Sequence, residues 1–191
     1  TAASKGYDNS TDIILTPELS LWGYPAKDLL LKRNLIEKQY EILEKLSKEI
    51  KNKYRKLSII VGIAEIIKDS FFPNLYNSIA LIEDGKWKII ARKIILPTYE
   101  VFDERRYFRS AEEVSVLTKK IQNKTWNIGI TICEDLWVNS NIEGRGVHKK
   151  NPILELKSKK IDILLNLSAS PYTFRKLDIR TKISSDAAQN L

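Results

Sequence analysis

The chain has a single cysteine, Cys133, and the residues around it make it the first candidate for chemistry. It follows the alternating segment Trp126–Ile132, which predicts a central buried strand, and precedes Glu134 and Asp135, an acidic pair typical of a helix start. A thiol at such a turn points out of the sheet edge, and the helix N-terminus is expected to lower its pKa. The alternative is a cysteine that packs as a small apolar side chain, which is the commoner fate of a lone cysteine.

The partner that would take the thiol proton is not an obvious histidine. The only histidine, His148, lies in the polar, glycine-containing segment Asn139–Lys150, where a histidine is usually just solvated. One cysteine and one histidine cannot make an ordinary zinc site, so no metal is expected. The sequence also has no Gly-x-Ser-x-Gly elbow and no glycine-rich phosphate loop. These absences direct attention to carboxylates.

Two further charged residues lie where predicted strands end. Glu18 follows the predicted strand Asp12–Thr16 in an apolar setting, where burial can raise the pKa of a carboxyl enough for it to act as a base. Lys93 immediately precedes an apolar stretch, and with the backbone N–H of Glu134 it would form a two-donor oxyanion hole. Each such donor is typically worth about 3 kcal/mol in the barrier. The alternatives are a carboxylate that caps a turn and an ordinary surface lysine.

Strands and helices alternate along the chain and would position these residues. The predicted strands are Asp12–Thr16, Leu57–Glu65, Asn77–Ile82, Trp87–Arg92, Trp126–Ile132 and Asp162–Leu167, and the predicted helices are Asp28–Asn52, Pro152–Lys160 and Asp178–Gln189. The pair Asp84-Gly85 indicates a hairpin. Strands too apolar to face water, interleaved with helices, indicate an α/β fold with sheets covered by helices. Periodicity alone leaves a doubly wound sheet and a layered αββα sandwich open.

Length, charge and composition exclude several other classes of protein. At 191 residues the chain fits one domain, and no apolar run approaches the roughly 20 residues of a membrane span. No signal peptide opens the sequence, so a cytoplasmic location and no membrane partner are expected. The net charge is +8, but basic and acidic residues are interspersed, which favours a solvated surface over a nucleic-acid site. The initial Thr1 and the absence of methionine suggest an excised piece.

The order Glu18, Lys93, Cys133, each at a strand end, resembles the nitrilase or carbon–nitrogen hydrolase superfamily. Four segments narrow the resemblance to the glutaminase domain of glutamine-dependent NAD synthetases: Pro17–Leu31, with its Pro-Glu-Leu, Gly-Tyr-Pro and Asp-Leu-Leu signatures, Lys93–Phe108, Gly129–Trp137 and Asn166–Pro171. The run Phe-Asp-Glu-x-Arg-Tyr-Phe at 102–108 is far more specific than a general nitrilase match. The resemblance covers essentially the whole chain.

This resemblance implies a nitrilase-type αββα sandwich over residues 1–191, incomplete because the family's first strand and C-terminal strands are missing. It also implies a mechanism: Glu18 is the general base, Cys133 attacks the side-chain amide of L-glutamine, and Lys93 stabilises the oxyanion before water hydrolyses the thioester. Glu104 matches a supporting carboxylate. By family position, the residues that would hold glutamine are Tyr99, Glu134, Trp137, Ser170 and Lys176.

Two positions depart from the family pattern. The family often has a small residue where Glu100 stands, and it has glycine where Arg175 stands. A carboxylate such as Glu134 suits the α-ammonium of glutamine, and a cation suits the α-carboxylate. Arg175 and Lys176 therefore compete for the carboxylate role.

The resemblance implies no cofactor in this domain. ATP, Mg and deamido-NAD are expected only in the synthetase domain, which would consume the ammonia and is absent from this sequence. L-glutamine, that synthetase domain and further copies of the chain in a homo-oligomer are the expected partners. The competing hypotheses are a stand-alone amidase or carbamoylase of the same superfamily and a non-catalytic interaction domain. A nucleic-acid-binding module ranks last.

Overall fold

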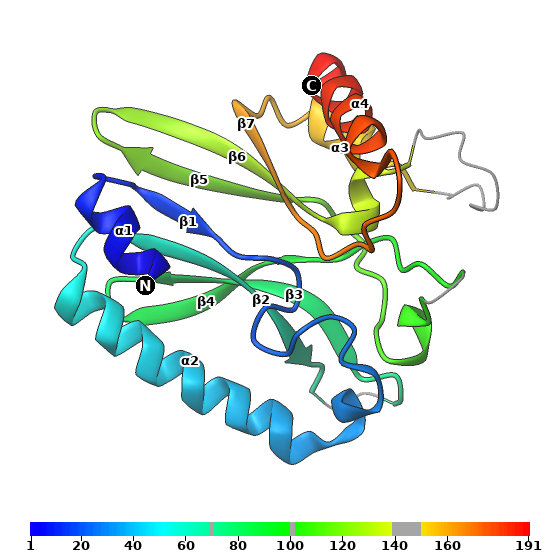
Figure 1. Cartoon of the computed structure of the whole chain (residues 1–191), viewed down its shortest axis with the longest axis horizontal. Coiled ribbons are helices and arrows are strands. Elements are labelled where there is room, and N and C mark those ends of the chain that lie inside the picture. The colour runs from blue at the N-terminus through cyan, green and yellow to red at the C-terminus, as the bar shows by residue number, and fades with distance from the viewer. Residues whose placement is uncertain (69–70, 100–101, 139–149) are drawn as a thin grey trace.

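The computed structural model describes residues 1–68, 71–99, 102–138 and 150–191. Its helices and strands alternate around two β-sheets (Figure 1). The strands are β1 (Ile13–Leu15), β2 (Ser58–Ile66), β3 (Leu75–Glu83), β4 (Lys86–Arg92), β5 (Ser115–Ile121), β6 (Lys124–Ile132) and β7 (Ile163–Leu167). The α-helices are α1 (Ala2–Asp8), α2 (Arg33–Lys53), α3 (Pro152–Lys157) and α4 (Lys176–Asn190), and the short 3₁₀ helices are η1 (Lys27–Leu31), η2 (Glu104–Arg106) and η3 (Cys133–Leu136).

The two sheets pack face to face. The first has the order β1-β2-β3-β4, with β1 parallel to β2 and the other neighbours antiparallel. The second has the order β5-β6-β7, with β6 antiparallel to β5 and parallel to β7. Apolar residues of both sheets, including Ile60 and Ile79 from the first and Ile128 and Ile130 from the second, form one buried cluster between them. The interior of the molecule is therefore the space between the sheets.

Helices cover the outer faces of this pair of sheets (Figure 1). Leu43 and Ile50 of α2 pack on Val61 and Ile63 of the first sheet. The second sheet presents Gly129 to α3, where a Cβ would lie 3.4 Å from the methyl groups of Leu156. The result is a layered αββα sandwich, as the resemblance implies. This arrangement also confirms the prediction that β6 is a central strand packed closely on both sides.

The predicted hairpin and the predicted strands are confirmed, and two helix boundaries need correction. The helix predicted over Asp28–Asn52 begins only at Arg33, because Lys32 is extended (φ −91°, ψ 95°) and η1 precedes it. The break lets Leu30 enter a buried cluster with Leu19 and Ala26 beside the Glu18 loop. The helix predicted over Pro152–Lys160 ends at Lys157, since the chain turns through a left-handed Lys160 (φ +50°) towards β7.

None of the helices in the described ranges is long and apolar enough to cross a bilayer. The strand ends matter more for function. The loop after β1 carries Glu18, the segment after β4 begins with Lys93, and η3 directly after β6 begins with Cys133. The first two belong to one sheet and the third to the other, so the site lies where the two layers meet.

Candidate active site

Lys93 is the centre of a buried cluster of charges. Its Nζ lies 2.7 Å from Glu18 Oε1 and 2.7 Å from Glu104 Oε1. The side chains of Lys93 and Glu18 are fully buried, and that of Glu104 is only 5% exposed. Burial alone would lower the pKa of Lys93, but the two carboxylates raise it well above its usual value. The lysine is therefore a fixed ammonium, as an electrostatic catalyst requires.

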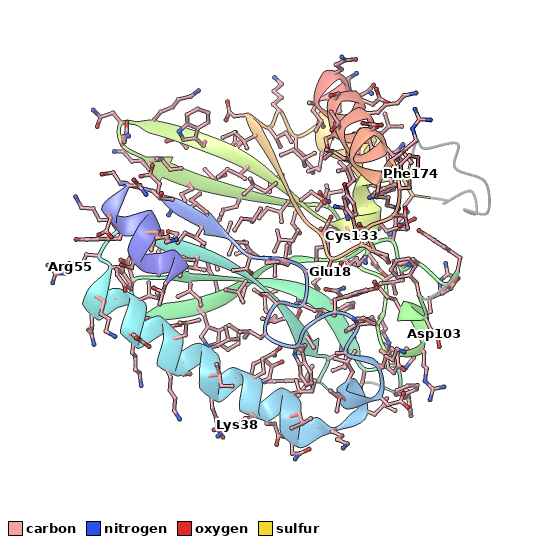
Figure 2. The ribbon with its side chains drawn as sticks, in the orientation of Figure 1. Glu18, Lys38, Arg55, Asp103, Cys133 and Phe174 are labelled. Atoms are coloured by element: carbon pink, nitrogen blue, oxygen red, sulfur yellow. The ribbon has the colours of Figure 1, made fainter. Side chains whose placement is uncertain are left out.

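The nucleophile candidate adjoins this cluster. Cys133 is 4% exposed and has a left-handed backbone (φ +45°), a conformation that costs a non-glycine residue energy and marks a tight elbow. Figure 2 shows Cys133 close to Glu18, and the charges of Glu18 and Lys93 both act on the thiol. The structure thus brings together the three residues predicted as catalytic.

The predicted direction of the Cys133 pKa shift was wrong. Burial raises the pKa of the thiol to about 12, the charge of Glu18 raises it further, and Lys93 opposes both. The expected helix is only the four-residue 3₁₀ turn η3, whose short dipole cannot outweigh the loss of solvent. The resting cysteine is a neutral thiol that needs a base to become a nucleophile.

The neighbours of Glu18 hold its carboxylate in place. Asn77 Nδ2 donates a hydrogen bond of 2.8 Å to Glu18 Oε1, which also accepts from Lys93. Behind the loop, β2 has a glycine, Gly62, where a Cβ would lie 2.4 Å from the backbone N of Leu19. Only glycine allows this approach, so β2 acts as a flat support for the Glu18 loop.

Glu104 has a second partner besides Lys93. Tyr24 Oη donates a hydrogen bond of 2.7 Å to Glu104 Oε1. Burial raises the pKa of Glu104 above its usual value, and Lys93 opposes the rise without cancelling it. Burial also raises the pKa of Tyr24, which therefore stays a donor. This hydrogen bond ties the Gly-Tyr-Pro segment to the same cluster.

The residues predicted to hold a substrate make two contacts at the Cys133 elbow and one contact with α4. Tyr99 Oη donates a hydrogen bond of 2.8 Å to Glu134 Oε2, and Lys176 Nζ lies 4.7 Å from the centre of the Trp137 ring. Ser170 is held separately, since its Oγ accepts a hydrogen bond of 2.5 Å from Arg180 of α4.

The rival cation, Arg175, lies on the surface. Its side chain is 74% exposed and lies 3.9 Å from Asp178. Lys176 is thus the one of the two cations that contacts a residue of the elbow.

Sequence reasoning missed Asn77 and Tyr24 as partners of the charged cluster. Asn77 lies in the predicted strand Asn77–Ile82 but gave no signal of its own, whereas Tyr24 lies in the Gly-Tyr-Pro signature and could have been found there. Glu100 and His148 lie outside the described residues. Within the described ranges, no group of three or more His, Cys, Asp or Glu side chains is arranged to hold a metal ion.

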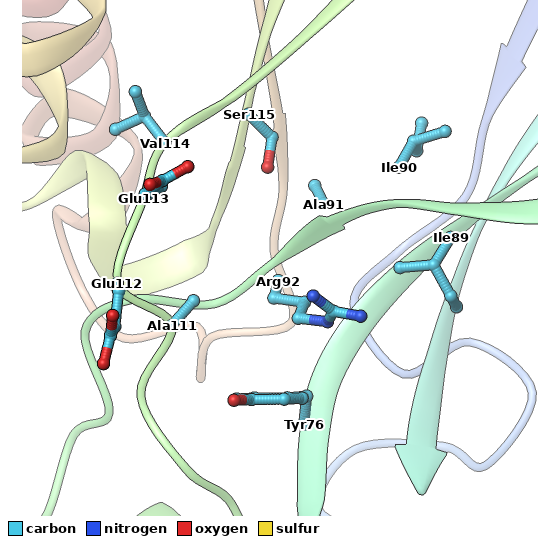
Figure 3. Close-up of a pocket in the computed structure, with 10 residues that line it drawn as sticks. All are labelled: Tyr76, Ile89, Ile90, Ala91, Arg92, Ala111, Glu112, Glu113, Val114 and Ser115. Carbon is cyan, nitrogen blue, oxygen red and sulfur yellow. The ribbon is translucent and has the colours of Figure 1, made fainter. Parts of the chain in front are cut away.

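A separate cavity of about 420 Å³ opens between the end of β4 and the start of β5 (Figure 3). Its wall includes Arg92, which pairs with Glu65 at 2.6 Å and lies 5.0 Å from the centre of the Tyr76 ring. Neither Glu18, Lys93 nor Cys133 lines it. This hollow is distinct from the candidate active site.

The fold and the site define a class. The family model of carbon–nitrogen hydrolases matches residues 1–143, and the chain belongs to that family. Along the sequence it is 38% identical over 192 residues to a glutamine-dependent NAD(+) synthetase of Synechocystis, an alignment that covers 99% of this chain and 33% of that protein.

Solved structures give the same picture. A glutamine-dependent NAD+ synthetase from Acinetobacter baumannii, in complex with ADP, superposes with a TM-score of 0.80 and 30% identity over 98% of this chain and 31% of that one. A mutant of an amidase from Nesterenkonia, of the nitrilase superfamily, superposes with a TM-score of 0.73 at 14% identity, covering 98% of this chain and 62% of that one. The amidase supports the fold alone. The chain spans about a third of the length of the synthetases that it matches.

Proposed function

We propose that this chain is a glutaminase that hydrolyses L-glutamine to glutamate and ammonia through a thioester on Cys133. The observation that carries the proposal is the buried ammonium of Lys93, held at 2.7 Å by Glu18 and by Glu104 beside the chain's only cysteine. The similarity to glutamine-dependent NAD synthetases along nearly the whole chain supports glutamine as the substrate.

The first step is proton transfer from the Cys133 thiol to Glu18. One carboxylate oxygen, Oε1, is engaged by Lys93 and Asn77, whereas Oε2 is buried and has no hydrogen-bond partner among the described residues. An unpartnered carboxylate oxygen costs free energy until a proton reaches it. Because the thiol is neutral at rest, this acceptor is what makes the sulfur nucleophilic.

The sulfur then attacks the side-chain amide carbon, and the carbonyl oxygen becomes an oxyanion. Lys93 Nζ and the backbone N–H of Glu134 stabilise it, at about 3 kcal/mol for each donor. The C–N bond breaks as Glu18 returns its proton to the leaving nitrogen, which departs as ammonia. Water next attacks the γ-glutamyl thioester while Glu18 accepts its proton, and glutamate leaves as the proton returns to the sulfur of Cys133.

The elbow and the residues around it also supply groups that fit the two charged ends of glutamine. The carboxylate of Glu134, oriented by Tyr99, binds the α-ammonium of glutamine. Lys176, which lies over the Trp137 ring, binds the α-carboxylate. Ser170, held by Arg180, completes the set. A simple amide lacks both charged ends, which is how the site would select glutamine.

The ammonia would serve a second reaction. By similarity to the synthetases, it amidates deamido-NAD in a synthetase domain, and ATP and Mg would be bound there and not in this chain. We propose that domain as a partner, together with further copies of this chain in a homo-oligomer.

A substrate panel with matched variants tests the proposal. Ammonia release is measured from L-glutamine, from simple aliphatic amides and from N-carbamoyl amino acids. The wild-type chain is expected to prefer L-glutamine, and C133S and E18Q are expected to lose at least 100-fold. The control is E83Q, because Glu83 also pairs with a lysine, Lys119, but lies away from Cys133. Faster turnover of carbamoyl compounds, or no turnover by a folded chain, would overturn the proposal.

A further inference from the structure

Another buried carboxylate, outside the charged cluster, links the two sheets at the site. Asp135 is 2% exposed. Its Oδ1 accepts hydrogen bonds from the backbone N–H groups of Ile94 at 3.1 Å and Ile95 at 2.7 Å. Its Oδ2 accepts a third from the N–H of Ile132 at 3.0 Å. One side chain thus satisfies three backbone donors that come from two different segments.

Those two segments carry the nucleophile and its electrostatic partner. Ile94 directly follows Lys93 in the segment after β4, a strand of the first sheet. Ile132 directly precedes Cys133 and is the last residue of β6, a strand of the second sheet. Since the sheets are joined at this point by packing rather than by a shared ladder, their relative position needs another constraint. The carboxylate of Asp135 provides one within a residue or two of both reacting groups.

We propose that Asp135 is a positioning residue that fixes the Cys133 elbow of one sheet against the Lys93 segment of the other. The inference rests on the proposed glutaminase function for its catalytic consequence, but the geometry that it describes is independent of the substrate. The three hydrogen bonds of Asp135 all come from backbone N–H groups. Asp135 acts through the backbone beside both reacting groups.

The chemistry of the side chain favours this role over simple packing. A fully buried carboxylate is costly, and burial raises the pKa of Asp135 to about 7, with Lys93 and the three N–H groups opposing the rise. The three N–H donors reach both oxygen positions of the side chain, so both positions must be acceptors. A carboxylate has them, whereas an asparagine must turn its NH₂ towards at least one N–H and lose that hydrogen bond.

The test compares D135N with a matched control, D162N. Asp162 Oδ2 also accepts a backbone N–H of β6, that of Asn127 at 2.8 Å, but at an exposed position near the other end of the strand. Because Cys133 is the only cysteine, alkylation by iodoacetamide at fixed pH reports on its thiol without ambiguity. Thermal melting and glutamine hydrolysis are measured on the same samples.

We expect D135N to slow alkylation of Cys133 by about tenfold, because a displaced Lys93 no longer lowers the thiol pKa. The kcat for glutamine is expected to fall by roughly 10- to 100-fold, and D162N should stay within twofold on both measures. The direction is diagnostic. Removing a nearby negative charge without moving Lys93 would lower the thiol pKa and speed alkylation, so unchanged or faster alkylation in a folded D135N chain overturns the proposal.

Two arms keep this test separate from the proposed function and from folding. If the wild-type chain hydrolyses no glutamine, the alkylation rates still decide the positioning role. If D135N fails to fold, the wild-type amide resonances of Ile94, Ile95 and Ile132 are titrated by NMR alongside the alkylation rate. If the three amide resonances titrate with one common pH midpoint, and the alkylation rate shows a step at the same pH, the proposal is supported. Different midpoints for the three resonances, or an alkylation rate without such a step, overturn it.

Discussion

The backing of the Glu18 loop by Gly62 leads to a sharp prediction for G62A. A Cβ at this position would lie 2.4 Å from the N of Leu19, 2.7 Å from the O of Pro17 and 2.9 Å from the carbonyl carbon of Glu18. All three are backbone atoms, so no side chain can rotate away. Restoring the 3.4 Å at which ordinary contact begins requires the loop to retreat by about 1 Å. Glu18 would move with it, out of its position beside the thiol.

A misplacement of about 1 Å in a catalytic group costs on the order of 100-fold in rate. We therefore expect G62A to lower kcat for glutamine by about that factor, with a loss of about 1–3 kcal/mol in unfolding free energy from overpacking. Cys133 should still be alkylated by iodoacetamide, because its elbow belongs to the other sheet and the atoms nearest the new Cβ all belong to the Glu18 loop. The combination of lost turnover and retained alkylation distinguishes a displaced base from a collapsed site.

The matched control is G129A, a glycine-to-alanine change in the central strand of the other sheet. There the new Cβ would meet Cδ1 of Ile161 at 2.6 Å and the methyl groups of Leu156 at 3.4 Å, which are the ends of flexible side chains. We expect G129A to keep turnover within threefold of the wild type. If folded G62A and G129A chains hydrolyse glutamine equally well, the reasoning about the Glu18 loop is refuted.

Three further outcomes follow from the charged cluster. Replacing Asn77 by leucine removes the 2.8 Å hydrogen bond to Glu18. A hydrogen bond to a charged group is worth enough free energy for kcat to fall by about 10- to 100-fold in steady-state assays. An unchanged kcat would contradict the role of Asn77 in holding Glu18. K93M leaves two buried carboxylates unpaired and should cost about 3–5 kcal/mol in urea unfolding, and adding E104Q should recover part of that loss; no recovery would contradict the shared pairing. Since the pKa of Cys133 is raised to about 12, its alkylation rate should climb about tenfold per pH unit between pH 8 and 10, above the titration of Asp135; a plateau below pH 9 would show a lower pKa.

That Glu18, Lys93 and Cys133 belong to one site could be predicted because each lies at the end of a strand with a strong pattern. Alternating isoleucines with small residues between them marked β6, and the Asp84-Gly85 turn, with φ of +51° and +78°, marked the β3–β4 hairpin. These signals are local, and they set where Lys93 and Cys133 emerge. Motif resemblance then supplied the pairing with Glu18, which periodicity alone could not.

What the sequence could not provide depends on contacts between distant segments. The direction of the Cys133 pKa shift follows from burial in the assembled site, whereas the neighbouring acidic pair suggested only a helix start. In the sequence, Asp135 looks like one member of that acidic pair. Its carboxylate nevertheless accepts hydrogen bonds from backbone N–H groups 40 and 41 residues away. Lys32 breaks the amphipathic pattern of α2 because Leu30 packs into a tertiary cluster, and no helical periodicity records that competition.

The central claim is that Cys133 is the nucleophile of a site that selects glutamine. Labelling the chain with a glutamine-shaped electrophile, read by intact mass and peptide mapping, tests it most directly. The account predicts a single adduct on Cys133 that excess L-glutamine blocks and N-carbamoyl amino acids do not. No adduct on a demonstrably folded chain, or labelling that glutamine fails to block, would contradict it.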